Sequence, residues 1–479
     1  SVRDRLPHVR KVVLFEGSAS ADGWVEPLTV FEAGGKVFAA ENPDAYRLAH
    51  GAIEPHHLAT LIYTSGTTAQ PKGVMLTHDA WVYEAEALDL LGVMTPADRQ
   101  LLFLPLAHVF AKVLQLAFIR LGMPTVIDGN PETVFQTLAS QHPTWMAGVP
   151  RLFERAQERL LADVERGGFA KRRVFAWALS VGREMSAVHQ QGRRPGARLR
   201  ARHALARRLV FDDVAARFGG QLRFFISGGA PLNPDIALFF HALDVLVLEG
   251  WGLTESAGAS CVNTPDDPVF GTVGRPLPGC QIKIAEDGEI LLKSRGVMKG
   301  YHDDPASTAE VLTEDGWLRT GDIGDRLQSG HVRITDRKKD LIITAGGKNV
   351  APTQFQELLK GRCPYVEDAV VIGDRRPHCV ALVTLNLEAA RRFAKAEGLK
   401  ASTYAELAGL DALRAIIEAH VAEANETLPR FARVKAWAIL PETLSLENGT
   451  LTPSLKVKRR VVEARYADVV ARLYAENRR

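Results

Sequence analysis

One short run of the chain concentrates the residue types that bind phosphate. Residues 63–74 read Tyr-Thr-Ser-Gly-Thr-Thr-Ala-Gln-Pro-Lys-Gly-Val and overlap the end of the apolar stretch Leu58–Tyr63. Such a segment offers backbone N–H groups, hydroxyl donors and one cation, Lys72, to a polyanion. Its spacing is close to that of the G-x-x-x-x-G-K-[ST] phosphate loop. However, Pro71 has no N–H and Gly73 has no hydroxyl, so the run predicts a phosphate loop of a different kind.

The composition is typical of a soluble globular protein. The chain has 479 residues, of which 46% are hydrophobic and 24% charged, and its formal net charge is +3. The length predicts two or more domains, and the small net charge does not favour nucleic acid as a partner. The four cysteines have neither a C-x-x-C pair nor a metal-ligand spacing. This pattern indicates reduced thiols and a cytoplasmic location.

The order of the apolar runs predicts a layered α/β architecture. Short apolar segments alternate with helical patterns through the first two thirds of the chain, which favours mostly parallel sheets. From Gly279 onward short strands with tight turns follow, with Asp287-Gly288 as a hairpin turn. Beyond Asp336–Asp340 the pattern is that of a small α+β region. We therefore expect a large multi-layer domain over residues 1–337 and a mobile small domain over residues 338–479, joined by a hinge. The expected strands include residues 99–104, 124–128, 144–148, 222–227, 369–373 and 379–385, and the expected helices are 131–140, 150–166 and 410–426.

Residues 63–74 resemble the phosphate loop of the adenylate-forming enzymes, whose consensus reads roughly [YF]-T-S-G-T-T-G-x-P-K-G-V. Ala69 stands where this family usually has glycine. Five later segments resemble further motifs of the family in the expected order: Ser227–Leu232, Glu249–Glu255, Gly316–Asp322, Asp336–Ile342 and Leu451–Arg460. Members of the family begin further upstream, so we expect the 1–337 domain to lack an N-terminal segment.

The resemblance implies roles for individual residues. In this family a substrate carboxylate attacks the α-phosphorus of ATP directly, so catalysis consists of positioning and of cations near the phosphates. The implied catalytic residues are Lys72, Glu255, Lys456 and His108, the last near the substrate carboxylate. The implied nucleotide-binding residues are Thr64, Ser65, Gly66, Thr67, Thr68, Gly228, Gly229, Ala230, Pro231, Glu249, Gly250, Trp251, Gly252, Thr254, Asp322, Arg337 and Lys339. Thr67 and Glu255 are the implied Mg²⁺ site, Asp322 and Arg337 the ribose contacts, and Lys339 the hinge.

Several details are similar to the long-chain fatty acyl-CoA synthetase branch of the family. They include Leu104–Phe110, Gly148–Glu154 and the ending T-P-x-L-K-x-K-R. When the ending is aligned on its two arginines, Lys456 takes the catalytic place and Lys458 is the competing choice. The resemblance implies a ligase that converts ATP and a fatty acid to acyl-adenylate and pyrophosphate. It then transfers the acyl group to coenzyme A and releases AMP.

Other functions stay open at this level. A fatty acid–AMP ligase that feeds a carrier protein, or a medium-chain or aryl-acid ligase, would use the same adenylation residues. A nucleotide- or lipid-binding relative without turnover is the non-enzymatic alternative. The basic run Arg193–His203, with Arg207 and Arg208, is either a solvated helix face or a surface that docks on anionic lipid. Under the second interpretation the cytoplasmic protein also contacts the inner membrane face peripherally. The oligomeric state is not readable from the sequence.

Overall fold

The computed structural model describes residues 3–64, 71–451 and 457–476, and the chain divides into two compact units. The first unit, Ser1–Leu58, contains a short 3-10 helix, a pair of parallel strands and two helices. These elements are η1 (Arg3–Arg5), β1 (Val12–Leu14), β2 (Val25–Pro27), α1 (Leu28–Glu41) and α2 (Ala45–Gly51). The second unit, Ala59–Arg479, contains every candidate site residue named above.

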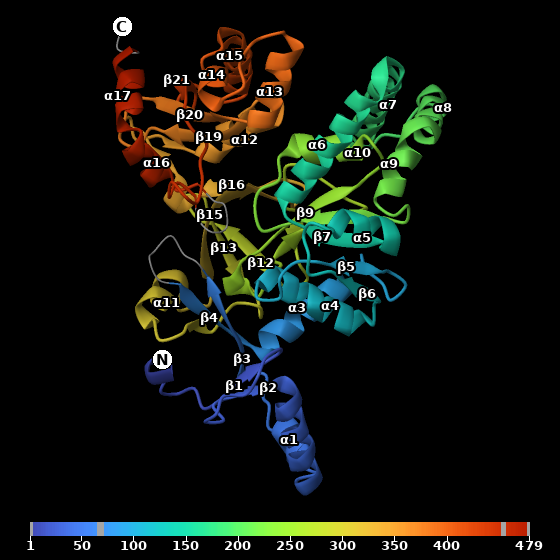
Figure 1. Cartoon of the computed structure of the whole chain (residues 1–479), viewed down its shortest axis with the longest axis vertical. Helices are drawn as coiled ribbons and strands as arrows, with labels where there is room; N and C mark the ends of the chain where they lie inside the picture. The colour runs from blue at the N-terminus through green and yellow to red at the C-terminus, as the bar shows by residue number, and fades with distance from the viewer. Residues whose placement is uncertain (1–2, 65–70, 452–456, 477–479) are drawn as a thin grey trace. The chain divides into compact units, whose positions relative to one another are not determined.

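A seven-stranded sheet lies at the centre of the second unit as far as the structure describes it (Figure 1). Its order is β11-β10-β9-β8-β7-β5-β6, in which β9 to β6 run parallel and β10 and β11 are antiparallel at one edge. The strands are β5 (Gln100–Leu102), β6 (Thr125–Ile127), β7 (Trp145–Gly148), β8 (Phe224–Ser227), β9 (Val247–Trp251), β10 (Cys261–Val262) and β11 (Arg275–Pro276). The strands predicted over 99–104, 124–128, 144–148 and 222–227 are confirmed.

Helices cover both faces of this sheet because successive side chains of a strand point to opposite faces. Leu101, Met146 and Phe225 pack with α6, α7 and α10, whereas their chain neighbours Leu102 and Trp145 pack with α3 and α4. The helices are α3 (His78–Leu90), α4 (Val109–Leu121), α5 (Val134–Gln141), α6 (Pro150–Arg166), α7 (Gly168–Gln190), α9 (Asp212–Arg217) and α10 (Pro234–His241). The structure therefore has the layered α/β architecture that the alternating pattern predicts.

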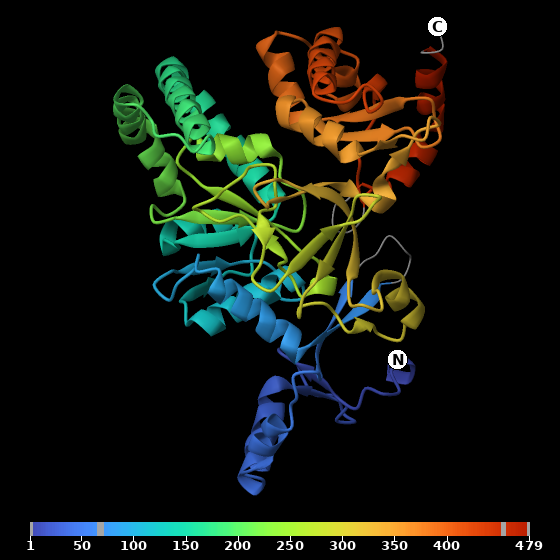
Figure 2. The same ribbon diagram turned by 180° about the vertical axis from the view of Figure 1, so that it is seen from behind.

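Helices α7 and α8 (Ala197–Ala206) lie side by side in both views (Figure 1, Figure 2). From α8 the chain continues through a π-helical turn, η2 (Arg207–Phe211), into α9. The basic run of the sequence thus lies in the connection between α7 and α8, along α8 and at the start of η2. No helix among the described residues is long and apolar enough to cross a membrane.

Smaller sheets flank the central one. The three-stranded sheet β14-β4-β3 joins β3 (Leu58–Thr64) and β4 (Lys72–Thr77) to the distant β14 (Gly300–Tyr301). The order β12-β13-β15-β16 forms an antiparallel sheet of β12 (Gln281–Ile284), β13 (Glu289–Lys293), β15 (Leu318–Arg326) and β16 (Val332–Arg337). The predicted hairpin at Asp287-Gly288 connects β12 to β13, and Gly288 takes the positive φ of 85° that such a turn requires. The connecting elements are η3 (Thr254–Ser256), α11 (Pro305–Val311) and η4 (Lys338–Asp340).

The C-terminal region is an α+β fold with helices on both faces of one sheet. Its strands β19 (Val366–Ile372), β20 (Cys379–Leu385) and β21 (Val434–Ile439) form the order β19-β20-β21. One face packs on α12 (Pro352–Arg362) and α15 (Asp411–Glu426), and the other on α16 (Arg459–Arg465) and α17 (Ala467–Glu476). The remaining elements are β17 (Ile342–Ile343), β18 (Asn349–Val350), α13 (Leu387–Ala396) and α14 (Tyr404–Ala408). The helix predicted over 410–426 is α15.

Candidate active site

The candidate adenine slot lies where the parallel strands β8 and β9 end. The backbone geometry requires glycine at two positions there. Gly229 has a φ of 82°, and a Cβ on Gly252 would lie 1.5 Å from the carbonyl oxygen of Gly258. Bulkier residues would be strained at the first position and would clash at the second. Gly228 is buried, whereas Ala230 and Pro231 are exposed beside it, so this turn presents mostly backbone to a bound molecule.

Two buried polar atoms in this slot have no hydrogen-bond partner among the described residues. They are Ser227 Oγ and Glu249 Oε1, and the two residues face each other in the β8–β9 register. Burial raises the pKa of Glu249 to about 7, although backbone N–H groups of Leu232 and Gly271 act in the opposite direction. An unpaired buried acceptor is costly unless a ligand or water satisfies it. The slot therefore suits a ligand with hydrogen-bonding edges, such as a nucleobase.

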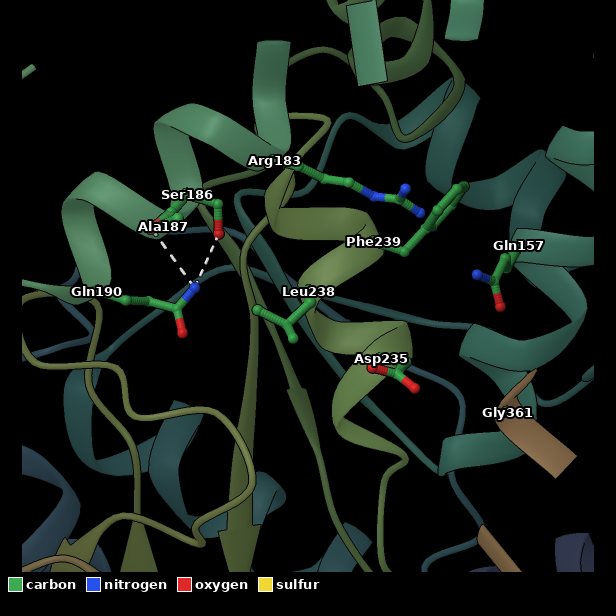
Figure 3. Close-up of a pocket in the computed structure, with 9 residues that line it drawn as sticks. All are labelled: Gln157, Arg183, Ser186, Ala187, Gln190, Asp235, Leu238, Phe239 and Gly361. Atoms are coloured by element: carbon green, nitrogen blue, oxygen red, sulfur yellow. Dashed lines mark hydrogen bonds between the residues drawn. The ribbon is translucent and has the colours of Figure 1, made fainter. Parts of the chain in front are cut away.

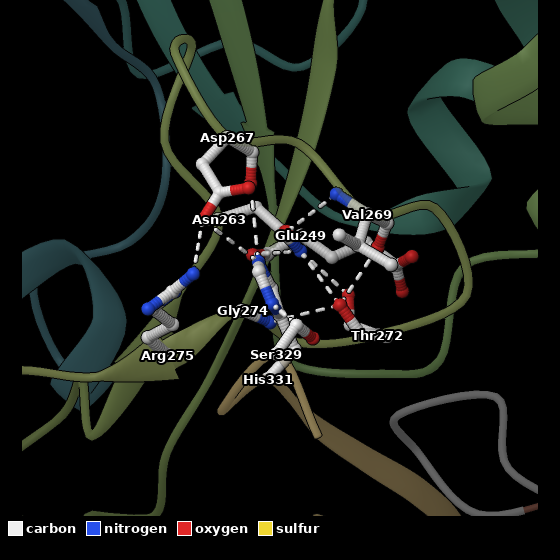
Figure 4. A network of polar contacts seen from close by, with 9 residues as sticks. All are labelled: Glu249, Asn263, Asp267, Val269, Thr272, Gly274, Arg275, Ser329 and His331. Carbon is white, nitrogen blue, oxygen red and sulfur yellow. Dashed lines mark hydrogen bonds and ion pairs between the residues drawn. The ribbon is translucent and has the colours of Figure 1, made fainter. Parts of the chain in front are cut away.

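A polar network holds the loop behind Glu249 in place (Figure 4). The backbone N–H of Asn263 donates to the Glu249 carbonyl at 2.9 Å, and its side-chain amide donates to the Thr272 carbonyl at 2.6 Å. The buried His331 ring bonds through Nε2 to the Asp267 carbonyl at 3.1 Å. The Asn263 contact fixes the backbone of β9 at Glu249, directly before Gly250.

The candidate ribose site is a carboxylate with both oxygens already engaged. Trp251 Nε1 donates to Asp322 Oδ2 at 2.8 Å, and Arg337 Nε lies 2.7 Å from Asp322 Oδ1. Asp322 and Arg337 are paired in the β15–β16 register. Burial raises the pKa of Asp322 despite the opposing effects of Arg337, Trp251 and Lys339. Lys339 lies two residues after Arg337, in η4, and its charge is the smallest of these effects.

The candidate phosphate site joins Lys72 and Glu255 through a residue that the sequence motifs do not include. Tyr301 donates its hydroxyl to Glu255 Oε1 at 2.9 Å, and Lys72 Nζ lies 5.0 Å from the centroid of the Tyr301 ring. Lys72 Nζ also donates to Ser307 Oγ at 2.6 Å, and Thr64 Oγ1 donates to the Lys72 carbonyl at 3.5 Å. Thr254 begins the η3 turn that carries Glu255.

The remaining predicted residues are distributed as follows. His108 is the N-cap of α4, where its Nδ1 accepts from the backbone N–H of Phe110 at 3.2 Å. In the neutral tautomer that makes this contact, the ring proton is on Nε2. Lys458, the competing choice for the catalytic lysine, is the exposed N-cap of α16. Ser65, Gly66, Thr67, Thr68 and Lys456 lie outside the described residues.

The larger of two described cavities involves other residues (Figure 3). It has a volume of about 460 Å³ and is bounded by α6, α7, α10 and Gly361 of α12. Arg183, Gln157 and Asp235 are among its polar side chains, and it shares no lining residue with the predicted site.

In the described part of the chain, no three His, Cys, Asp or Glu residues gather as a metal cluster. A hard cation at the candidate phosphate site would therefore need oxygen ligands from a bound phosphate chain as well as from Glu255.

Two family models match the chain almost end to end. The AMP-binding enzyme model matches residues 5–302, and the AMP-binding enzyme C-terminal domain model matches residues 339–478. The chain belongs to the AMP-binding enzyme family. Among its relatives, the long-chain-fatty-acid–CoA ligase FadD15 of Mycobacterium tuberculosis is 36% identical over 475 residues, which cover 98% of this chain and 76% of that protein. This places the AMP-binding enzyme in the fatty acyl-CoA synthetase branch of the adenylate-forming superfamily.

Solved structures support the fold of this AMP-binding enzyme. The adenylation domain of a Mycobacterium chelonae carboxylate reductase matches with a TM-score of 0.64 at 24% identity, over 88% of this chain and 61% of that one. The o-succinylbenzoate coenzyme A synthetase of Bacillus subtilis, solved with ATP and a magnesium ion, matches with a TM-score of 0.58 at 22% identity, over 85% of this chain and 70% of that one. The α/β fold with a large N-terminal and a smaller C-terminal domain is therefore that of adenylate-forming enzymes, which use ATP.

Proposed function

We propose that this enzyme is a long-chain fatty acid–CoA ligase. Two observations support the nucleotide half. Asp322 is held between Trp251 and Arg337. Strand β9, which carries Trp251, also carries Glu249, whose Oε1 has no described partner, like Ser227 Oγ opposite it. This arrangement suits a nucleoside, with hydroxyls at one end and a base at the other. The other two proposed substrates are a long-chain fatty acid and coenzyme A. They are inferred from the similarity to named long-chain-fatty-acid–CoA ligases over nearly the whole chain.

In the first half-reaction the fatty-acid carboxylate attacks the α-phosphorus of ATP. The new acyl–oxygen–phosphorus bond forms as the bond to pyrophosphate breaks, and negative charge grows on the phosphoryl oxygens. Lys72 and Lys456 are the proposed cations at these oxygens. His108 is the proposed donor to the carboxylate, which it would hold in line for attack. Mg²⁺, which supplies positive charge to the departing pyrophosphate, would be held by Glu255, by Thr67 and by the phosphates themselves.

In the second half-reaction the CoA thiolate attacks the acyl carbonyl, and the acyl–phosphate bond breaks to release AMP. One lysine cannot attend the first step and leave room for CoA in the second. We therefore propose that the small domain, over residues 338–479, rotates about Lys339 between the steps. The Gly346-Gly347 loop, which precedes β18, would then line the CoA path.

Product analysis tests this function. Purified enzyme is given ATP, Mg²⁺ and a panel of fatty acids from short to long chain, with and without CoA, and AMP, acyl-CoA and acyl-adenylate are measured. A long-chain CoA ligase releases AMP and thioester only when CoA is present, with a maximum at long chains. Adenylate that accumulates regardless of CoA would instead favour a fatty acid–AMP ligase, and a maximum at short or aromatic acids would favour the other acid classes.

We also propose peripheral contact with an anionic membrane through a surface formed by α7, α8 and η2. Its exposed apolar residues are Phe169, Val174, Leu205 and Leu209, with 67%, 40%, 51% and 53% of their surface accessible. Val174 and Leu209 line one shared groove of about 260 Å³ together with Lys171. Arg172, Arg173, Arg207 and Arg208 are exposed on the same elements. Exposed apolar side chains with arginines on the same elements match a bilayer surface with acidic headgroups, which also holds the fatty-acid substrate.

Vesicle sedimentation tests this contact. Wild-type enzyme should bind vesicles with 30% phosphatidylglycerol more strongly than pure phosphatidylcholine, and high salt should weaken the binding. Arg207→Glu with Arg208→Glu should reduce binding, as should Leu209→Ser, while Arg375→Glu, at an exposed arginine of the C-terminal region, serves as the charge control. Equal binding of wild type and both surface variants would exclude this surface.

A further inference from the structure

One tyrosine connects the two charged groups of the candidate phosphate site. The hydroxyl of Tyr301 donates to Glu255 Oε1 at 2.9 Å, while Lys72 Nζ lies 5.0 Å from the centroid of its ring. Tyr301 is 8% exposed, so its ring is held by packing rather than by solvent. A hydroxyl bonded to one carboxylate oxygen leaves the other oxygen of Glu255 for a cation. An aromatic face near an ammonium attracts it electrostatically.

Strand pairing gives Tyr301 its place. Tyr301 pairs with Val74 and Gly300 with Met75 in the antiparallel β14–β4 register. The flanking Lys299 N–H donates to the Met75 carbonyl at 2.9 Å and His302 N–H to the Gly73 carbonyl at 2.8 Å. The backbone that carries the tyrosine is therefore fixed directly beside the strand that begins with Lys72.

The same segment also holds the backbone of the Glu255 turn. The N–H of Met298 donates to the Glu255 carbonyl at 2.8 Å, three residues before Tyr301. Lys72 has a second support, because Asp304 caps α11 and thereby orients Ser307, to which Lys72 donates. Residues 298–307 thus contact both Lys72 and Glu255 through backbone and side chain.

We propose that Tyr301 is a positioning residue that sets the distance and orientation between Lys72 and Glu255 before ATP binds; this inference rests on their proposed roles at the phosphates and at Mg²⁺. Its hydroxyl fixes the rotamer of the Glu255 carboxylate, in the way that partners of metal ligands commonly do. Its ring holds the Lys72 ammonium on one side. Each function belongs to a separable part of the side chain, so substitution can divide them.

Tyr301→Phe removes only the hydroxyl, and Tyr301→Leu removes the aromatic ring as well. The experiment measures the increase in melting temperature that ATP gives the enzyme as Mg²⁺ is titrated, together with ATP–pyrophosphate exchange. Tyr474→Phe is a matched control: Tyr474 is 7% exposed, its hydroxyl donates to backbone carbonyls, and Arg376 lies 5.2 Å from its ring centroid. Glu255→Gln provides the reference for loss of the metal ligand.

We expect Tyr301→Phe to raise the Mg²⁺ midpoint of the ATP-induced stabilisation about 10-fold, with saturating Mg²⁺ restoring the exchange rate. Tyr301→Leu should also raise the KM for ATP by about 2- to 5-fold, and Mg²⁺ should not restore it. Tyr474→Phe should keep the wild-type midpoint. If Glu255→Gln shifts the midpoint and Tyr301→Phe does not, the inference is wrong. If Glu255→Gln itself has the wild-type midpoint, the proposed metal role fails and the inference with it.

Discussion

The indole N–H of Trp251 donates to the carboxylate of Asp322 at 2.8 Å, between strands of two different sheets. The indole of Trp251 therefore supplies a hydrogen-bond donor as well as an aromatic face. This donor forms a hydrogen bond with the carboxylate that we propose as the ribose contact, so one hydrogen bond links the candidate base site to the candidate ribose site.

Trp251→Phe should therefore weaken ATP binding more than loss of ring area would suggest. Removing a hydrogen bond to a charged group should raise the KM for ATP about 10-fold, with a smaller change in kcat. Trp437→Phe is the control, since buried Trp437 likewise donates to a carboxylate, Glu418, but in the C-terminal region. Initial-rate kinetics give the KM for ATP of each variant. An equal increase of this KM in both variants would contradict a direct role of Trp251 in ATP binding.

Glu249 should make the enzyme less stable as pH rises. Its folded pKa is raised to about 7 from an ordinary value of 4.5, so the folded state holds a proton that the unfolded state has lost. Stability should then fall between about pH 4.5 and pH 7, by about 3 kcal/mol from this group. Glu249→Gln has no such proton to lose. Its melting temperature relative to wild type should be higher at pH 8 than at pH 5.

Glu286→Gln, at an exposed glutamate, is the control for this comparison. Its difference from wild type should be the same at both pH values. If the melting temperature of Glu249→Gln differs from that of wild type by the same amount at both pH values, the substitution has only altered packing. The raised pKa of Glu249 is supported only by a difference that changes with pH. A Glu249→Gln difference that does not change with pH would contradict the raised pKa.

Lys456→Ala should nearly abolish adenylate formation and leave CoA transfer from supplied acyl-adenylate largely intact. A cation lost from a growing anion costs about 10²- to 10³-fold in rate. Lys458→Ala is the matched control two residues away. Single-turnover assays of each half-reaction separate the steps. Normal adenylation in Lys456→Ala together with a defect in Lys458→Ala would move the catalytic assignment to Lys458.

Lys339→Pro should divide the two half-reactions. Proline fixes φ near −65°, within the short η4 segment Lys338–Asp340. The contacts of Asp336 with Thr353 across this segment, at 3.0 and 3.2 Å, would have to change if the domain rotates. We expect one half-reaction near the wild-type rate and a sharp loss in the other, while Lys339→Ala keeps both. Two unaffected half-reactions would rule out Lys339 as the pivot, and equal loss of both would indicate misfolding.

The sequence predicts the elements well because each depends on local patterning. The helix over 150–166 matches α6 at both ends, and the strand over 379–385 matches β20. The structure brings Asp322 and Arg337 together, as the two motifs imply, and their role at a ribose stays a prediction. The boundary at 337/338 and the role of Lys456 stay predictions.

What the sequence cannot supply are contacts made between distant segments. Tyr301 stands in no motif that signals chemistry, and only the pairing of β14 with β4 brings it to Lys72. The unpaired acceptors of Ser227 and Glu249 likewise become visible only when the strands are in register. Side-chain direction at such sites follows from tertiary packing, which local propensity does not encode.

The contact between Lys72 and Ser307 spans 235 positions of the chain, and this separation constrains when the phosphate site can exist. Contacts between distant segments are closed late in folding, after shorter loops have formed. A chain still emerging from the ribosome therefore has its glycine-rich segment long before it has the partners of Lys72. ATP should consequently slow unfolding of the finished enzyme without speeding its folding, because the nucleotide has little to hold until the end of the process.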